Sequence, residues 1–377
     1  MPGNRTRHSD LIGDTVAPEK KTNIGFVGLN FGHWVIEQQI LTGPGAPLFH
    51  LAGICDQNAE LLKSRAAQYG VRAFASLDAM LAEKSIEVIG LFTPPVGRAD
   101  LVRRIIRAGK DVITTKPFER DAAAALAVLQ EARSLGRTVH INSPGPLRTA
   151  DWQQVEHWRE RYNLGRPVAA QFSTWVSYRE KPDGTWLDDP QRCPVAPIFR
   201  LGIYSINDMV RLLGPAESVQ VASTRLMTER ITPDNAHLTL QFKSGAIGGI
   251  FASFCVNDGD FYADAMVLNF ESGTVYINAG APAESRDRVP LQLVMRVGET
   301  CRVVDQTVVP RANRAGSYQW EVLHRAIHGE KMTGLVTPEQ VTQAIAIVEA
   351  MARSQQSQRC ERVDDVSSSP TAVAQRL

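Results

Sequence analysis

The first part of the chain alternates short apolar runs with amphipathic segments. From Asn23 to about Asn142 the apolar runs read NIGFVGL, PLFHLAGIC, IEVIGLF, KDVITT and RTVHIN. Helical segments such as AELLKSRAAQYG and RDAAAALAVLQEARSLG lie between them, and several end in glycine, as expected just beyond a helix. Continuous apolar strands separated by such helices predict a parallel sheet covered on both faces. The expected fold class is α/β, with an N-terminal doubly wound parallel sheet that binds a nucleotide.

The pattern changes after the segment SPGPLR, whose prolines interrupt helices and strands alike. A helix, TADWQQVEHWRERY, precedes the strand-like runs VAAQFSTWV, AHLTLQF, GAIGGIFASFCV, DAMVLNF and GTVYIN, which are joined by turn signals such as KSG and ESG. This texture predicts a C-terminal α+β domain with a large, mostly antiparallel open sheet. We expect flexible tails at 1–22 and 364–377, a nucleotide-binding domain at 23–146 and a second domain at 147–363.

Composition excludes several classes of function. The 41 Lys+Arg and 40 Asp+Glu leave a net charge of +1, which offers no basic footprint for nucleic acid. No apolar run approaches the roughly 18 residues of a membrane span, and the N-terminus lacks the apolar core of a secretion signal. Five scattered cysteines and eight histidines form no metal-ligand motif. We expect a cytoplasmic protein without a metal, a membrane partner or a nucleic-acid partner.

The first strand leads into a glycine-rich turn. Gly28 fills the first position of a dinucleotide-binding turn, Asn30 replaces the second glycine, and Gly32 falls one residue before the third. Small residues are needed here because the backbone approaches the pyrophosphate. Asn tolerates a left-handed backbone, so we expect the turn to form with Asn30 in place. The sequence predicts cofactor contacts from Gly28, Asn30, Phe31 and Gly32.

An acidic residue follows the second strand. Asp56 is placed to accept hydrogen bonds from the adenosine ribose hydroxyls and to repel a 2′-phosphate, so NAD is favoured over NADP. The alternative is that Asp56 only caps the helix that starts near Asn58.

Two residues from different halves of the chain are candidates for the chemistry. Lys116 follows the fifth strand, DVITT, at the end where such sheets bind ligands. The segment from Ile203 to Leu213 is predicted as a helix with one apolar stripe. Its other side carries Tyr204, Asn207, Asp208 and Arg211, at spacings of three and four residues.

These motifs together resemble the glucose–fructose oxidoreductase / inositol dehydrogenase / rhizopine catabolism family over about residues 23 to 360. The resemblance implies a Rossmann domain, a C-terminal domain whose open sheet mediates homodimers or homotetramers, and nicotinamide-dependent oxidation or reduction of a sugar, sugar acid or cyclitol. Besides the glycine-rich turn and the G-x-Y-x-x-N helix, it rests on one run of residues: Thr93, Pro94, Ala108, Gly109, Lys110, Val112, Lys116 and Pro117.

Carried onto this chain, the family's pattern assigns roles to several residues. Thr93, Pro94 and Lys116 would contact the cofactor, and Lys116 matches the lysine of the family's E-K-P motif. Tyr204 resembles the tyrosine of one branch of the family, and Asn207 takes the place of a final Asp. The sequence departs from the pattern at Thr115, Arg200 and Asn30.

The expected mechanism uses Tyr204 as a proton relay, while Lys116 holds the substrate oxygen and lowers the tyrosine pKa. Asn207 and Asp208 are expected to bind substrate. Arg200 has two interpretations: it binds a substrate carboxylate, or it forms an ion pair with Asp188, Asp189 or Asp208. Two other functions stay open, a non-catalytic ligand sensor of the same fold and an NAD-dependent glycosidase.

Overall fold

The computed structural model describes residues 21–258, 262–280, 287–311 and 318–366. Most of the two predicted tails, residues 1–20 and 367–377, therefore lies outside the described part. Six parallel strands form the first sheet, as the run of buried apolar segments predicts. These are β1 (Thr22–Val27), β2 (Phe49–Cys55), β3 (Arg72–Ala73), β4 (Val88–Leu91), β5 (Asp111–Thr114) and β6 (Val139–Ile141).

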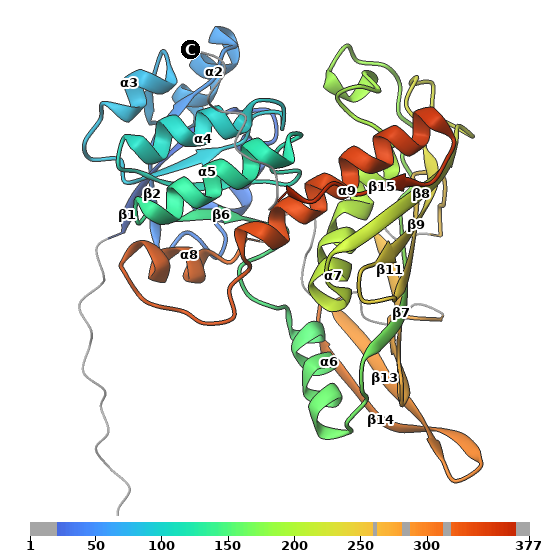
Figure 1. Ribbon diagram of the computed structural model, residues 1–377. Helices are drawn as coiled ribbons and strands as arrows, with labels where there is room; N and C mark the ends of the chain where they lie inside the picture. The colour runs from blue at the N-terminus through green and yellow to red at the C-terminus, as the bar shows by residue number, and fades with distance from the viewer. Residues whose placement is uncertain (1–20, 259–261, 281–286, 312–317, 367–377) are drawn as a thin grey trace, which may run out of the picture.

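The strand order β3-β2-β1-β4-β5-β6 is doubly wound, and every pairing is parallel. Each residue of β4 and β5 is buried, because helices cover both faces of this sheet (Figure 1). The helices of this half are α1 (Gly32–Val35), which continues into a π-helical segment, 36–41, and α2 (Ala59–Tyr69), α3 (Leu77–Leu81), α4 (Arg98–Arg107) and α5 (Ala122–Ser134).

A second, nine-stranded sheet follows the helix α6 (Ala150–Arg161). Its strands pair antiparallel except for one parallel pair, which confirms the expected mostly antiparallel C-terminal sheet. The strands are β7 (Pro167–Trp175), β8 (Ala216–Thr224), β9 (Asn235–Phe242), β10 (Ile247–Ser253), β11 (Ala263–Phe270), β12 (Gly273–Ile277), β13 (Arg288–Val297), β14 (Thr300–Pro310) and β15 (Glu361–Arg362).

The order of this sheet is β14-β13-β12-β11-β7-β10-β9-β8-β15. Its strands alternate buried and exposed residues, as in β9, because helices lie against one face only (Figure 1). The covering helices are α6, α7 (Ile203–Leu213) and α9 (Pro338–Ser357). α9 starts at a capping box made by Thr337 and Gln340.

Two helices tie the halves together. α9 also packs against α5, where the backbone N–H of Ala122 donates to Glu349 Oε1 at 3.0 Å. α8 (Trp320–Ile327) belongs by sequence to the second half but lies under the first sheet (Figure 1). Its Trp320 and Leu323 join one buried cluster with Ile24 and Phe49. No helix of the described ranges combines the length and the apolar composition that crossing a bilayer requires.

Candidate functional site

The turn after β1 needs glycine at its first position. Gly28 has φ +89°, and a Cβ there would lie 2.7 Å from the carbonyl oxygen of Phe92. Gly32 opens α1, where a Cβ would make only an ordinary contact, 3.4 Å from Phe92 Cβ. The described residues with positive φ do not include Asn30, so the turn does not use the left-handed backbone that Asn tolerates. The turn forms with ordinary φ at that position, and this is why it tolerates a side chain.

Asp56 connects this turn to the next one. Its Oδ2 accepts from the backbone N–H of Leu29 at 2.6 Å, and its Oδ1 accepts from the N–H of Asn58 at 2.8 Å. The helix α2 is capped by Asn58 itself, whose side chain accepts from the N–H of Leu61. Asp56 is therefore not the side chain that caps α2, and its carboxylate lies on the wall of the cleft.

One cleft of about 1380 Å³ extends from the glycine-rich turn to α7. It joins the carboxyl ends of β1, β2, β4 and β5 to residues of the second half of the chain, including Tyr178, Trp186 and Tyr262. Gly32, Asn207 and Asp208 are not among its lining residues. Of the residues expected from the sequence, those that line it are Gly28, Asn30, Phe31, Asp56, Thr93, Pro94, Lys116, Arg200 and Tyr204.

Lys116 lies just beyond β5 and lines this cleft. Its backbone N–H donates to Asn142 Oδ1 at 2.8 Å, and its Nζ donates to the carbonyl oxygen of Arg200 at 2.5 Å. The ammonium lies 4.8 Å from the centre of the Tyr204 ring. Burial, with a further contribution from the charge of Arg200, lowers the pKa of Lys116 to about 7. This amine gains or loses a proton near neutral pH.

Tyr204 approaches from the other half of the molecule. It lies in the first turn of α7, directly after a π-helical segment, 198–202. Its hydroxyl is buried and has no hydrogen-bond partner among the described residues. Burial raises the pKa of Tyr204 well above its usual value. The expectation that the neighbouring ammonium lowers this pKa is therefore wrong, and the phenol stays neutral.

Arg200 forms an ion pair, but not with a residue expected from the sequence. Its Nη1 and Nη2 donate to the two carboxylate oxygens of Glu180 at 2.6 and 2.7 Å. The guanidinium also stacks on Phe254, 4.7 Å from the ring centre. The expected partners Asp188, Asp189 and Asp208 do not supply this contact, and Asp188 binds Arg230 instead. Glu180 therefore neutralises Arg200 at the wall of the cleft.

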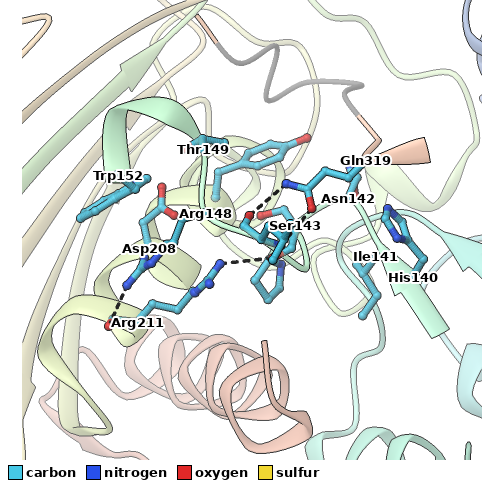
Figure 2. A pocket seen from close by; sticks show the side chains of 14 residues that line it. His140, Ile141, Asn142, Ser143, Arg148, Thr149, Trp152, Asp208, Arg211 and Gln319 are labelled. Atoms are coloured by element: carbon cyan, nitrogen blue, oxygen red, sulfur yellow. Dashed lines mark hydrogen bonds between the residues drawn. The ribbon is translucent and has the colours of Figure 1, made fainter. Parts of the chain in front are cut away.

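Asn207 and Asp208 point away from the cleft. The Asn207 side chain is buried and donates from Nδ2 to Ser143 Oγ at 2.9 Å. Asp208 lines a separate cavity of about 80 Å³, together with Arg148 and Arg211 (Figure 2). The structure does not bring these two residues to the place where a cleft-bound substrate lies.

Sequence reasoning missed two residues that shape the cleft. Arg98, only 1% exposed, donates to the carbonyl oxygens of Thr115 at 2.6 Å and Pro117 at 2.5 Å, and it also binds the carbonyl of Thr93. Burial lowers the pKa of Arg98 to about 10. Glu119 accepts from the N–H of Ala99 at 2.7 Å, at the start of α4. Arg98 thereby fixes the ends of β4 and β5.

The cleft fits a dinucleotide at its first-sheet end. Gly28 leaves room where a Cβ would strike the Phe92 carbonyl, and Asp56 presents a carboxylate to the cleft. The Thr93 hydroxyl is buried without a protein partner among the described residues, and it belongs to the same wall. A close-approach glycine, a carboxylate for the ribose and an unpaired hydroxyl are the features that such a ligand requires.

Comparison with known proteins gives matches for both halves of the chain. A family model described as "Oxidoreductase family, NAD-binding Rossmann fold" matches residues 22–143. A second one, "GFO/IDH/MocA C-terminal domain", matches residues 152–276. The two matches follow the two sheets, so the first half is a NAD-binding Rossmann domain.

Individual relatives are more distant. An uncharacterized oxidoreductase of Schizosaccharomyces pombe is 28% identical over 174 residues, 45% of this chain and 45% of the relative. The UDP-N-acetylglucosamine 3-dehydrogenase of Acidithiobacillus ferrooxidans is 25% identical over 216 residues, 56% of this chain and 62% of the relative. The chain therefore spans about half the length of the curated relatives it matches.

A solved structure shows the same fold over most of the length of this chain. The WlbA dehydrogenase of Bordetella pertussis, in complex with NADH and UDP-GlcNAcA, superposes with a TM-score of 0.67 at 19% identity. The superposition covers 92% of this chain and 100% of the other. At this identity the likeness establishes the fold and leaves the substrate to the chemistry of the cleft.

Proposed function

Because the chain belongs to the GFO/IDH/MocA oxidoreductase family, we propose that it transfers hydride between nicotinamide and a carbinol or carbonyl carbon of a sugar or cyclitol. The observation that carries this proposal is the meeting of Lys116 and Tyr204 in one cleft with the NAD-binding turn. A relative whose name states a sugar-nucleotide substrate, the UDP-N-acetylglucosamine 3-dehydrogenase, supports the substrate class.

The proposed roles of the two residues follow from their burial. The cofactor supplies the redox chemistry when it is bound, and the protein supplies orientation and proton transfer. Lys116 turns its Nζ from the Arg200 carbonyl to the substrate oxygen, where its charged form stabilises the negative charge that develops. Tyr204 accepts the substrate's proton on its hydroxyl while it gives up its own, because burial prevents a lasting phenolate.

The charges along the cleft favour a neutral substrate over a sugar acid. Arg200 is held in two hydrogen bonds by Glu180, so its charge is already compensated. Tyr178 and Trp186 supply aromatic surface for a sugar ring on the same wall. We therefore propose a hydroxyl-rich, uncharged reacting ring, with turnover of a neutral sugar exceeding that of its uronic acid.

The experiment that tests this function compares Tyr204→Phe with the unmodified protein. We expect NADH formation with at least one member of a panel of polyols, sugars and nucleotide sugars. Tyr204→Phe should lower turnover by about 10² to 10⁴, the usual contribution of a positioned proton-transfer group. NAD affinity should stay within about twofold, because the ring and its packing remain. Tyr276→Phe, on the far sheet, is the matched control.

The outcomes separate the proposal from its alternatives. NAD binding without turnover of any panel member favours the ligand-sensing alternative. Cleavage of a glycoside without net NADH favours the glycosidase. Equal turnover in the Tyr204→Phe variant contradicts the assignment of the proton relay.

The open face of the second sheet supports a proposal about assembly. Ile247, Tyr276, Val303 and Val308 are exposed, and the strand registers place all four on the face opposite the covering helices. Exposed apolar side chains on an uncovered sheet face are typical of a contact between subunits. We propose that a second copy of the chain covers this face in a homodimer or homotetramer.

A further inference from the structure

Tyr204 lies where two cavities meet, the cleft and the smaller cavity of about 80 Å³. Tyr204 is the residue common to the linings of both. The walls of the smaller cavity come from segment 140–149, which begins in β6, from Trp152 of α6 and from Asp208 and Arg211 of α7.

Buried polar atoms without partners concentrate around this smaller cavity. Leaving one such atom unsatisfied costs about 1–3 kcal/mol, so a group of them implies polar contents. The volume is several times the roughly 10–15 Å³ that one water needs by this measure. The atoms without a partner among the described residues belong to side chains of the lining: His140 Nε2, Asn142 Nδ2, Arg148 Nη1, Trp152 Nε1 and Tyr204 Oη.

The charges around the cavity favour water over an anion. Arg148 pairs with Glu156 at 2.9 Å, and Arg211 follows Asp208 by three residues on the same helix. Arg211 also donates to the carbonyl oxygen of Gly145 at 3.2 Å. Two guanidinium groups are thus matched by two carboxylates, which leaves no net positive charge to attract an anion. Water satisfies donors and acceptors alike, so it fits the unpaired atoms.

We propose that water in this cavity carries the substrate's proton from Tyr204 Oη to Asp208, which releases it to solvent. This inference rests on the proposed function. As the substrate O–H bond breaks, its electrons form the carbonyl and the hydride leaves for the bound cofactor. The proton passes to Tyr204 Oη, while the hydroxyl's own proton passes to a water behind it and then to the Asp208 carboxylate. One proton enters the relay at Tyr204, and one leaves it at Asp208.

The placement of Asp208 suits the end of such a chain. Asp208 follows Tyr204 by one helical turn on the same face of α7, and it is half-buried, so it also reaches solvent. A buried phenol that cannot remain ionised must pass its proton on, and a bound substrate closes the cleft side. The charged and titratable groups around Asp208 are Arg211 on α7, Arg148 and Glu156 on the facing segment and helix, and His140 in β6.

Asp208→Asn tests the proposal, because it keeps the shape of the side chain and removes the proton acceptor. We expect kcat to fall about tenfold or more, while KM and NAD affinity stay within about twofold. The solvent deuterium isotope effect on kcat should rise, because proton transfer becomes slower than hydride transfer. Formate, a small carboxylate that can enter from solvent, should restore part of the rate.

Two further variants guard against a merely structural effect. Asp208→Glu keeps a carboxylate and should retain most of the rate. Glu160→Gln removes an exposed carboxylate of α6 that does not line the cavity, and it should leave kcat unchanged. A loss of kcat in Asp208→Asn without an isotope effect or formate rescue would overturn the relay. An unchanged kcat would overturn it as well.

A measurement without cofactor or substrate is independent of the proposed function. A crystal structure of the free protein should show ordered waters bonded to Asn142 Nδ2, Trp152 Nε1 and Arg148 Nη1. A cavity without water excludes the relay even if the enzyme turns over. If Tyr204→Phe also leaves kcat unchanged, the proposed function fails. If Asp208→Asn alone leaves kcat unchanged, only the relay fails.

Discussion

The two sheets of this molecule solve the same packing problem in opposite ways. The first has helices on both faces, and β4 and β5 are buried at every residue. The second has helices on one face, and β9 alternates buried with exposed residues. The first sheet offers a ligand only the carboxyl ends of its strands, whereas the second sheet offers a whole face. The comparison teaches that the strand ends of the first sheet carry the cofactor chemistry. The uncovered face of the second sheet is free for assembly.

The largest effect should come from a charge placed inside the first sheet, which helices cover on both faces. Ile113, in β5, has no exposed surface, and Ile113→Asp buries a carboxylate without a partner. This costs more than about 4 kcal/mol, a large share of the stability of a domain. We expect no cooperative thermal transition in circular dichroism. The control Ile113→Val should lower the free energy of unfolding by only about 0.5–1.5 kcal/mol. A folded Ile113→Asp protein would contradict the claim that helices bury both faces of the first sheet.

The next effect concerns the carboxyl ends of the strands of the first sheet. Asp56→Ala removes the carboxylate on the cleft wall, and with it charge-assisted hydrogen bonds worth about 1.5–3 kcal/mol. NADH affinity should fall about 10- to 100-fold, and the preference over NADPH should shrink because repulsion of the 2′-phosphate is lost. Fluorescence titration with both cofactors measures this. Glu60→Gln changes an acid in the first turn of α2, outside the cleft lining, and should leave both affinities as they were.

The pH dependence of turnover should distinguish the role of Lys116, at the strand ends of the first sheet, from that of Tyr204, which comes from the second half of the chain. The pKa of Lys116 is lowered to about 7, so the charged amine is present below that pH and is lost above it. Carbonyl reduction uses the charged form, so its kcat/KM should fall about tenfold per pH unit above about pH 7. Lys116→Arg stays charged, and any activity that it retains should vary little through this range. A rise of reduction above pH 7 would reverse the assigned role.

Several features of the fold and site followed from the sequence because they depend on local pattern. Runs of buried residues predicted β1, β2, β4, β5 and β6, and the spacing of Tyr204 and Asp208 placed them on one face of α7. The hairpin of β13 and β14 was missed, because many residues of β14 are exposed and its pattern is weak. The docking of α8 onto the first sheet also has no local signal.

The partners of charged residues were the least predictable part. Arg200 meets Glu180, twenty residues earlier in the chain, because β7 and the loop after it bring that carboxylate to the cleft. The spacing along α7 gives the face that Asp208 shares with Tyr204, but it does not tell which of two cavities that face meets. Such contacts are set by how distant segments pack, and this information is not contained in the period of one helix.

The smallest effect on folding, and the sharpest test of the comparison, should come from a charge on the open sheet. Tyr276, on β12, is 37% exposed on the uncovered face, so Tyr276→Lys places its ammonium in water in the single subunit. The free energy of unfolding of the subunit should change by about 0.5 kcal/mol or less. An assembly that buries this face must instead desolvate the charge, which costs several kcal/mol per subunit. Size-exclusion chromatography with light scattering should therefore show dissociation into subunits whose melting is cooperative. If the mass stays that of the unmodified protein, the open face is not the contact; if the subunit unfolds, it is not an independent surface.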